Sequence, residues 1–180
     1  MTDLFRRLLR ERLPLLFLAA SGGLLLAAFL FQHVGGLEPC PLCVAQRYPH
    51  FAALGLALAA LTAGRRLPVL APILFGMLAA CYLVGAGYAA FHVGVELGHF
   101  QSACSGHGAS GSLEELRARL HNAPRVLCDE VQWSLFGLSM AAWNGIASVV
   151  LALVAGYGGV LSATTARRRP THGRARPTPA

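Results

Sequence analysis

Charged side chains are scarce in this sequence, and lysine is missing altogether. Only 13% of the 180 residues are charged and 55% are hydrophobic, whereas an average soluble domain has roughly 25% charged residues. Every basic side chain other than histidine is therefore an arginine. This composition excludes an ordinary soluble domain and indicates a chain whose main solvent is lipid.

Long apolar runs are abundant instead. A helix needs about 20 mostly apolar residues to cross a hydrocarbon layer of about 30 Å. The sequence predicts four such spans, at about residues 13–34, 46–63, 67–91 and 135–163. The second run is the shortest and carries Arg47 and His50 near its start, so we expect its first turn at the headgroup level. The predicted fold is an all-α integral membrane protein, a bundle of four transmembrane helices within residues 1–163.

Arginines are distributed unevenly among the segments that flank these runs. Eleven lie before the first run, between the second and third, or after the fourth, and only four lie elsewhere. Because cationic side chains near span ends stay in the cytoplasm, we expect both termini to be cytoplasmic and segments 35–45 and 92–134 to lie outside the cytoplasm. Residues 164–180, rich in Arg, Pro and Thr, are predicted to be a disordered basic tail.

The arginines that give the chain its net charge of +7 are thus expected mainly on the cytoplasmic side of the membrane. The charge therefore need not indicate nucleic acid binding. Basic residues are not interleaved with aromatic ones as in RNA- or DNA-binding segments. The expected surroundings are a lipid bilayer, with anionic lipid near the basic tails and no nucleic acid partner.

The longer outer segment contains one helical pattern. A Gly/Ser-rich stretch, residues 105–112, precedes leucines at helical spacing in residues 112–122, and Ser112 with Glu115 matches a capping box. We predict a short amphipathic helix here. It either lies flat on the membrane surface or packs on the spans, and the pattern does not separate these two placements.

Four of the five cysteines fall in the two outer segments: Cys40 and Cys43 in the first, Cys104 and Cys128 in the second. Outer cysteines are expected to be paired in an oxidising compartment, so two pairs are the natural number. The C-x-x-C of Cys40 and Cys43 closes a very small ring, which is typical of a redox pair or a metal half-site rather than a structural staple. Cys104 and Cys128 suit a staple better.

A metal site is the competing interpretation of these cysteines. Zinc ribbons join one C-x-x-C to a second closely spaced pair, whereas Cys104 and Cys128 are far apart in the sequence. We therefore expect no metal on the four thiolates. Cys81, midway along the third run, is predicted to be a small buried apolar side chain rather than a reactive thiol.

Positive charge is expected close to Cys43. This residue begins the second apolar helix, and Arg47 follows four residues later on the same face. The partial positive charge of a helix N-terminus and the guanidinium both favour a thiolate, so we expect the pKa of Cys43 to lie below its usual value of about 8.5. Pro41 stiffens the ring, consistent with an easily reduced disulfide.

Several stretches of the sequence closely resemble the disulfide bond formation protein B (DsbB) family. In and around the first outer segment these are Phe31-Gln32-His33-Val34, Glu38-Pro39-Cys40-Pro41-Leu42-Cys43 and Gln46-Arg47. Near the fourth run they are Cys128-Asp129-Glu130-Val131-Gln132-Trp133, Gly137-Leu138, Met140 and Trp143. The loop between Cys104 and Cys128 is more Gly/Ser-rich and slightly shorter than the family pattern.

The resemblance implies an α-helical bundle in the bacterial inner membrane, with its redox cysteines in the periplasm. It further implies a protein disulfide:quinone oxidoreductase that reoxidises a periplasmic DsbA-like thiol oxidase and passes the electrons to ubiquinone or menaquinone. By position, Cys104 would hold the mixed disulfide with the oxidase and Cys128 would pass electrons to Cys40. Cys43 would then face the quinone.

The resemblance implies that Arg47, and His92 at the outer end of the third run, contact the quinone. For His92, a histidine that only lies at the membrane interface is the alternative. Two alternatives to a DsbB-like function stay open. A vitamin K epoxide reductase-like protein also couples outer cysteines to quinone, but its C-x-x-C lies near the last helix. A non-catalytic membrane scaffold with structural disulfides gives no reason for Arg47 one turn after Cys43.

Overall fold

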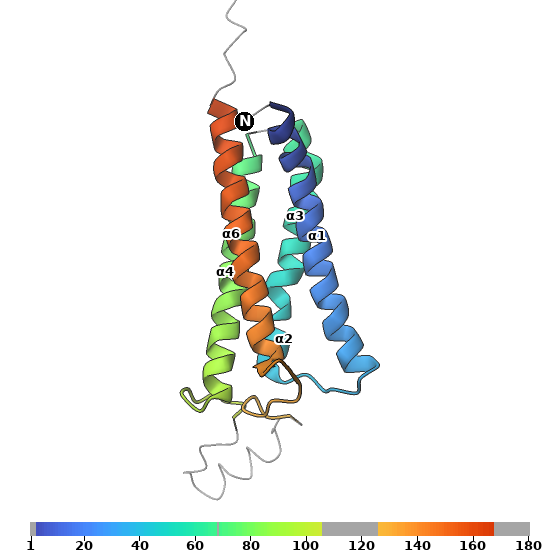
Figure 1. Ribbon diagram of the computed structural model, residues 1–180, viewed down its shortest axis with the longest axis vertical. Helices are drawn as coiled ribbons and strands as arrows, with labels where there is room; N and C mark the ends of the chain where they lie inside the picture. The colour runs from blue at the N-terminus through green and yellow to red at the C-terminus, as the bar shows by residue number, and fades with distance from the viewer. Residues whose placement is uncertain (1–2, 68, 106–125, 168–180) are drawn as a thin grey trace, which may run out of the picture.

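The computed structural model describes residues 3–67, 69–105 and 126–167, and this part of the chain is mostly helical. Its helices are α1 (Asp3–His33), α2 (Pro41–Ala45), α3 (Arg47–Arg66), α4 (Ala71–Glu96) and α6 (Met140–Arg167). Strands β1 (Ser134–Leu135) and β2 (Leu138–Ser139) pair antiparallel. The four long helices run alongside one another, and the cysteine-bearing segments lie at the end opposite the start of α1 and the end of α6 (Figure 1).

Three of the long helices have the length and apolarity of membrane spans: Glu11–His33, Ala71–Glu96 and Met140–Thr164. They expose large apolar side chains on their outer faces, such as Leu26 (60% exposed), Leu83 (61%) and Leu153 (70%). An outer surface of this kind suits contact with lipid tails. The prediction of three of the four spans is confirmed.

The predicted second span, residues 46–63, coincides with the 20-residue helix α3. This helix packs against α1 and α4. Its polar beginning, Arg47 to His50, and the arginines at its end keep it below the apolarity of the other three. Its role as a fourth span therefore stays a prediction.

Several boundaries differ from the sequence prediction. Helix α4 continues to Glu96, so His92 is helical rather than part of an outer loop. The fourth run does not become helical at Leu135, because residues 134–139 form the β1–β2 hairpin. Its two-residue turn has left-handed backbone at Phe136 (φ 54°) and Gly137 (φ 77°), as in hairpin turns of type I′. The residues at 135, 136 and 138 are apolar and therefore extended the predicted fourth run, although they belong to the hairpin and not to α6.

Two predictions concern residues at the limits of the described chain. The amphipathic helix predicted at 112–122 lies outside the described residues. The basic tail was expected to begin at 164, but α6 continues to Arg167. The remainder of the tail, residues 168–180, is also outside the described part.

Small residues bring α4 close to α6. A Cβ atom on Gly85 would lie 3.3 Å from Ser148 Oγ of α6 and 3.4 Å from Pro49 Cβ of α3. A Cβ atom on Gly145 would lie only 3.2 Å from Ala89 Cβ. Small residues at such positions permit the close approach of neighbouring membrane helices.

A buried hydrogen bond links α1 to α4 inside this apolar bundle. Ser21 Oγ and Tyr82 OH are 2.8 Å apart, and both side chains are fully buried. The Tyr82 ring also packs beside Phe17, with 5.8 Å between ring centroids. Because no water reaches such a position, each hydroxyl depends on the other for its hydrogen bond.

We predict that Tyr82→Phe destabilises the bundle by about 0.6–1.7 kcal/mol, which are the average and the largest values measured for hydrogen bonds between membrane helices. The melting temperature of the purified protein in detergent measures this loss. Tyr157→Phe is the matched control, because Tyr157 is 57% exposed. Equal melting temperatures for the two variants would contradict the assigned role of the bond.

Candidate functional site

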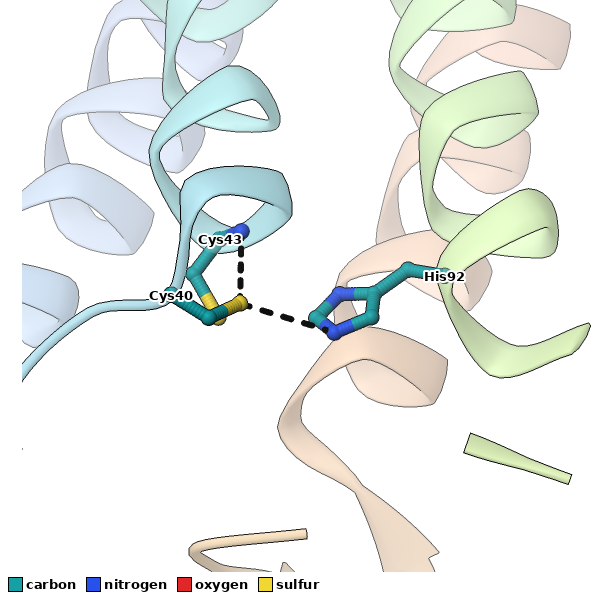
Figure 2. Close-up of side chains that lie close together, drawn as sticks. All are labelled: Cys40, Cys43 and His92. Carbon is teal, nitrogen blue, oxygen red and sulfur yellow. Dashed lines mark hydrogen bonds between the residues drawn. The ribbon is translucent and has the colours of Figure 1, made fainter. Parts of the chain in front are cut away.

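Cys40 and Cys43 are held by the single turn of α2. Cys40 is the N-cap of this helix, and its Sγ accepts a hydrogen bond of 3.1 Å from the backbone N–H of Cys43 (Figure 2). Pro41 occupies the first turn of the helix. Backbone N–H groups have no partner within the helix at this position, so the proline costs no hydrogen bond. The amide at this helix start is thus directed at the sulfur of Cys40, which is 2% exposed.

Cys104 and Cys128 form a disulfide with 5.4 Å between their Cα atoms. The predicted pairing of these two residues is confirmed. Cys40 and Cys43 are free thiols, so the expectation that all four outer cysteines are paired does not hold in this state. Cys40, Cys104 and Cys128 belong to one buried cluster, which also contains Val95 of α4.

His92 lies between the two cysteine pairs. Its Nε2 atom is 3.6 Å from Cys40 Sγ (Figure 2). The same atom is 3.2 Å from the carbonyl oxygen of Cys128. Its Nδ1 atom is 2.7 Å from Nε2 of Gln46. The imidazole is 4% exposed and uses both nitrogens for contacts that join α4 to both outer segments.

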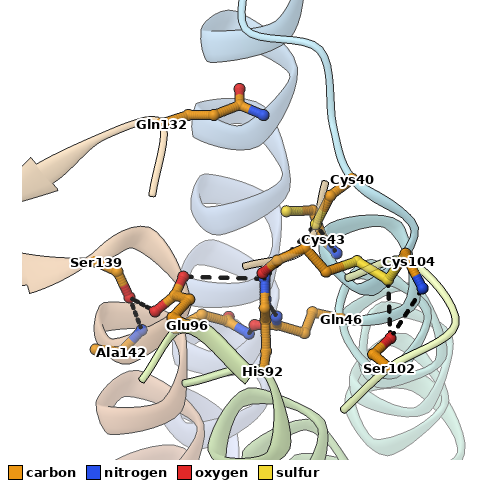
Figure 3. Close-up of polar contacts among 12 residues, drawn as sticks. Cys40, Cys43, Gln46, His92, Glu96, Ser102, Cys104, Gln132, Ser139 and Ala142 are labelled. Atoms are coloured by element: carbon orange, nitrogen blue, oxygen red, sulfur yellow. Dashed lines mark hydrogen bonds and ion pairs between the residues drawn. A yellow bond between two sulfur atoms is a disulfide. The ribbon is translucent and has the colours of Figure 1, made fainter. Parts of the chain in front are cut away.

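Glu96 lies one turn further along α4. Its carboxylate is 3.9 Å from His92 Nε2 and accepts a hydrogen bond of 2.6 Å from Ser139 Oγ (Figure 3). Ser139 also caps the start of α6 by accepting a bond from the N–H of Ala142. These contacts connect the end of α4 to the start of α6 beside the cysteines.

A chain of polar side chains runs from His92 into the bundle. Gln46 contacts His92 at one end of its amide and accepts a bond of 2.7 Å from Asn144 Nδ2 at the other. Asn144 Oδ1 is then 2.9 Å from Nε2 of His50. Sequence reasoning did not assign Asn144 or Glu96 to the site. The available signal was polar residues inside apolar runs, which are functional candidates in membranes.

The two free thiols have opposite pKa shifts. The pKa of Cys43 is lowered, mainly by a hydrogen bond from the Cys40 thiol and to a smaller extent by the positive charge of Arg47. The pKa of Cys40 is raised, because it donates that bond and because it is buried. The lowered pKa of Cys43 agrees with the sequence expectation, but the largest cause is Cys40 rather than a cation or the helix start.

Arg47 is fixed against α1. Its guanidinium donates a hydrogen bond of 2.7 Å to Gln32 Oε1 and lies over the ring of Phe29, with 5.0 Å to the centroid. Charge delocalised over a flat guanidinium suits both contacts. The side chain is thereby positioned at the wall of the cavity described next.

A cavity of about 270 Å³ opens beside the free thiols. Cys40, Cys43, Arg47 and His92 line it, while Cys104 and Cys128 lie behind Cys40 and do not reach it. Most of the remaining wall is apolar and comes from α1, the residues that lead into β1, and α6, including Leu24, Ala28, Phe31, Trp133, Met140 and Trp143. The structure thus brings four of the six predicted site residues to one cavity and the other two directly behind it.

Comparison with known proteins identifies the family. The family model described as disulfide bond formation protein DsbB matches residues 10–158. The chain belongs to the DsbB family. It is 37% identical to disulfide bond formation protein B of Xanthomonas euvesicatoria over 93% of this chain and 98% of that protein. It is 33% identical to the protein of the same name from Herminiimonas arsenicoxydans, over 78% and 90% of the two chains.

No solved structure matches the chain. Membership of the DsbB family, together with three helices of membrane-spanning length and apolarity among the described residues, makes it a multi-pass membrane protein of disulfide bond formation. The matched region contains all the cysteines of the site, Arg47 and His92.

For this DsbB-family protein we predict that Cys40→Ala raises the pKa of Cys43 more than Arg47→Gln does. The thiol of Cys40 is the larger cause of the lowered pKa, and the charge of Arg47 the smaller. The rate of iodoacetamide alkylation as a function of pH, in a Cys81→Ser background, reports the thiolate of Cys43. In the unsubstituted C-x-x-C, alkylation should stay fast as the pH falls below the usual thiol range. A larger shift in Arg47→Gln would show that the cation dominates.

Proposed function

We propose that this DsbB-family protein reoxidises a periplasmic DsbA-like thiol oxidase and transfers the electrons to ubiquinone or menaquinone in the bacterial inner membrane. One observation carries the proposal. A disulfide, Cys104–Cys128, is packed against Cys40 of a second cysteine pair, and this second pair borders an apolar cavity next to Arg47. The sulfurs are thus ordered from an outer couple to an inner couple to a space that suits a lipid-soluble molecule.

The first exchange takes place at the outer couple. A thiolate of the reduced oxidase attacks Cys104 Sγ, the Cys104–Cys128 bond breaks, and Cys128 leaves with the electron pair. The second thiol of the oxidase then resolves the mixed disulfide, so the oxidase leaves oxidised and the outer couple is reduced by two electrons. Ser102 Oγ, 2.9 Å from Cys104 Sγ, is placed to hydrogen-bond the sulfur that accepts this attack (Figure 3).

The second exchange moves the electrons inward. With the inner couple oxidised, Cys128 attacks Cys40 Sγ and releases Cys43. Cys104 then attacks Cys128 Sγ, which reforms the outer disulfide and releases Cys40, so the inner couple is left reduced. Cys43 has the lower pKa of the two inner sulfurs, and a thiol of lower pKa leaves faster. The packing of Cys40 against Cys104 and Cys128 favours the same choice of target sulfur. The described state, with a thiol pair inside and a disulfide outside, has the redox arrangement that follows this step.

The residues around the cavity fit a quinone. Its walls are largely apolar, as an isoprenoid-substituted ring requires, and Arg47 and His92 supply polar atoms near Cys43. A quinone bound there would supply a two-electron, two-proton acceptor. Arg47 would stabilise negative charge that develops on an oxygen at this wall, an effect that is stronger in a site sheltered from water.

The energetics favour an acceptor of this class. A thiol oxidase of the DsbA type has a potential of about −120 mV, so its reoxidation needs an acceptor with a higher potential. A difference of about 200 mV for two electrons supplies roughly 9 kcal/mol, since 30 mV corresponds to about 1.4 kcal/mol. This is enough to drive an unfavourable cysteine exchange within the relay.

The relay is tested with purified protein, reduced oxidase and ubiquinone, followed by the absorbance of the quinone. We expect Cys40→Ser and Cys104→Ser each to abolish quinone consumption, because each interrupts one exchange. Cys81→Ser is the matched control and should keep the full rate, since Cys81 lies on α4 outside the cavity lining. Persistent consumption in either of the first two variants would refute the relay.

A separate prediction concerns Arg47. We expect Arg47→Ala to raise the KM for quinone about tenfold or more, in keeping with about 1.5–3 kcal/mol for a hydrogen bond to a charged group. The rate of disulfide exchange with the oxidase should change much less, because Arg47 contacts α1 and the cavity rather than the outer couple. Steady-state kinetics with each substrate varied in turn separate the two effects. The reverse pattern would remove Arg47 from the quinone site.

A further inference from the structure

We propose that Cys40, Cys43 and His92 bind a thiophilic divalent metal ion such as Zn²⁺ when the Cys40/Cys43 pair is reduced, and that the bound ion arrests electron transfer. The first half of this proposal is independent of the proposed function, and the second half rests on it. The ion is an inhibitory ligand of one redox state, not a resident cofactor.

The positions of the three ligand atoms carry the inference. The two Sγ atoms and a ring nitrogen of His92 all lie within 4.8 Å of one another (Figure 2). Cys40 Sγ and His92 Nε2 are 3.6 Å apart. In a tetrahedral site with Zn–S of about 2.3 Å and Zn–N of about 2.0–2.1 Å, neighbouring S and N ligands are also about 3.6 Å apart. One edge of the coordination tetrahedron is therefore already formed.

The chemical identity of the ligands points to a soft or borderline ion. Two thiolates and one imidazole favour Zn²⁺ or a similar thiophilic ion over Mg²⁺ or Ca²⁺, which prefer oxygen ligands. Two Cys and one His leave a fourth position open for water, and Cys40, Cys43 and His92 all face the cavity, which offers space for it. The Glu96 carboxylate, 3.9 Å from His92 Nε2, adds negative charge close to the cation.

The contacts behind His92 also suit a metal ligand. A metal-binding imidazole usually hydrogen-bonds through its second nitrogen to a fixed acceptor. Here Nδ1 is 2.7 Å from the amide of Gln46, which is itself bonded to Asn144. Coordination through Nε2 places the proton on Nδ1, with the amide oxygen of Gln46 as its acceptor. Rotation of the Gln46 and Asn144 amides by half a turn reverses the donors while keeping the contacts.

Binding is restricted to one redox state. A Cys40–Cys43 disulfide has no thiolate to offer, so only the reduced pair coordinates the ion. Coordination displaces the remaining thiol protons to solvent and changes no oxidation state. While both sulfurs are bound to the metal, neither can form the disulfide through which electrons leave the inner couple. The ion would also displace the contact between His92 Nε2 and the carbonyl oxygen of Cys128.

The binding test uses full-length protein that carries Cys81→Ser, Cys104→Ser and Cys128→Ser, so that Cys40 and Cys43 are its only thiols. Titration of the reduced protein with Co²⁺ should produce thiolate-to-cobalt absorption that saturates at one ion per chain and is displaced by Zn²⁺. Oxidation of the pair should abolish the absorption. Absence of the band in the reduced protein overturns the proposal.

Variants of the histidine ligand and its partner sharpen this test. Gln46→Leu should raise the Kd for Co²⁺ about 10–100-fold, as is usual for the loss of a hydrogen bond behind a ligand, and His92→Ala should raise it further. His99→Ala is the matched control, because His99 is exposed beyond the end of α4, and it should leave the Kd unchanged. Unchanged affinity in both His92→Ala and Gln46→Leu means adventitious binding by the thiols alone and overturns the proposal.

Arrest is measured on the protein with all its cysteines. Zn²⁺ added to the reduced protein should slow iodoacetamide alkylation of Cys43 at least tenfold and stop quinone reduction, and chelation should restore both. Loss of quinone reduction without any Zn²⁺ would count against the proposed function and leave the cobalt result standing. Undiminished quinone reduction with Zn²⁺ bound would overturn the arrest.

Discussion

The contacts of a single buried imidazole organise the outer end of this protein. His92 touches Cys40 of the inner pair, the backbone of Cys128 in the outer pair, and Gln46 at the junction of α2 and α3. Polar groups in a dehydrated position must find partners within the protein. The chain that continues through Gln46 to Asn144 meets this requirement and joins α3 to α6. The positions of the cysteine sulfurs therefore depend on the same hydrogen bonds, through His92, Gln46 and Asn144, that hold the helices together at this end.

Hydropathy was sufficient to predict most of the fold, because lipid imposes long uninterrupted helices. It was insufficient where apolar residues form a β-hairpin instead of a helix, and where polar residues lie within a helix. Leu135 and Leu138 pair in a hairpin because the turn between them is left-handed, which hydropathy does not report. His92 and Glu96 extend α4 beyond its apolar stretch because the cysteine-bearing segments and Ser139 cover them.

The candidate site was predictable as a set of residue types but not as an arrangement. Four cysteines in the two segments between predicted spans, and an arginine one turn after C-x-x-C, are visible in the sequence. That Cys40 caps a five-residue helix, and is the chief cause of the lowered pKa of Cys43, depends on backbone geometry. The contact between Gln46 and Asn144 joins residues that are 98 positions apart, and no local pattern predicts such a pair.

It matters for the cavity that the cation at position 47 is an arginine and not a lysine. A lysine can lose its proton when it is transferred to an apolar site, whereas a guanidinium stays protonated at every pH that a cell encounters. Held between Gln32 and the ring of Phe29, Arg47 gives the cavity wall a positive charge at a fixed position. A change of pH around the site would thus change the protonation of the Cys40 and Cys43 thiols while leaving the charge at this wall constant.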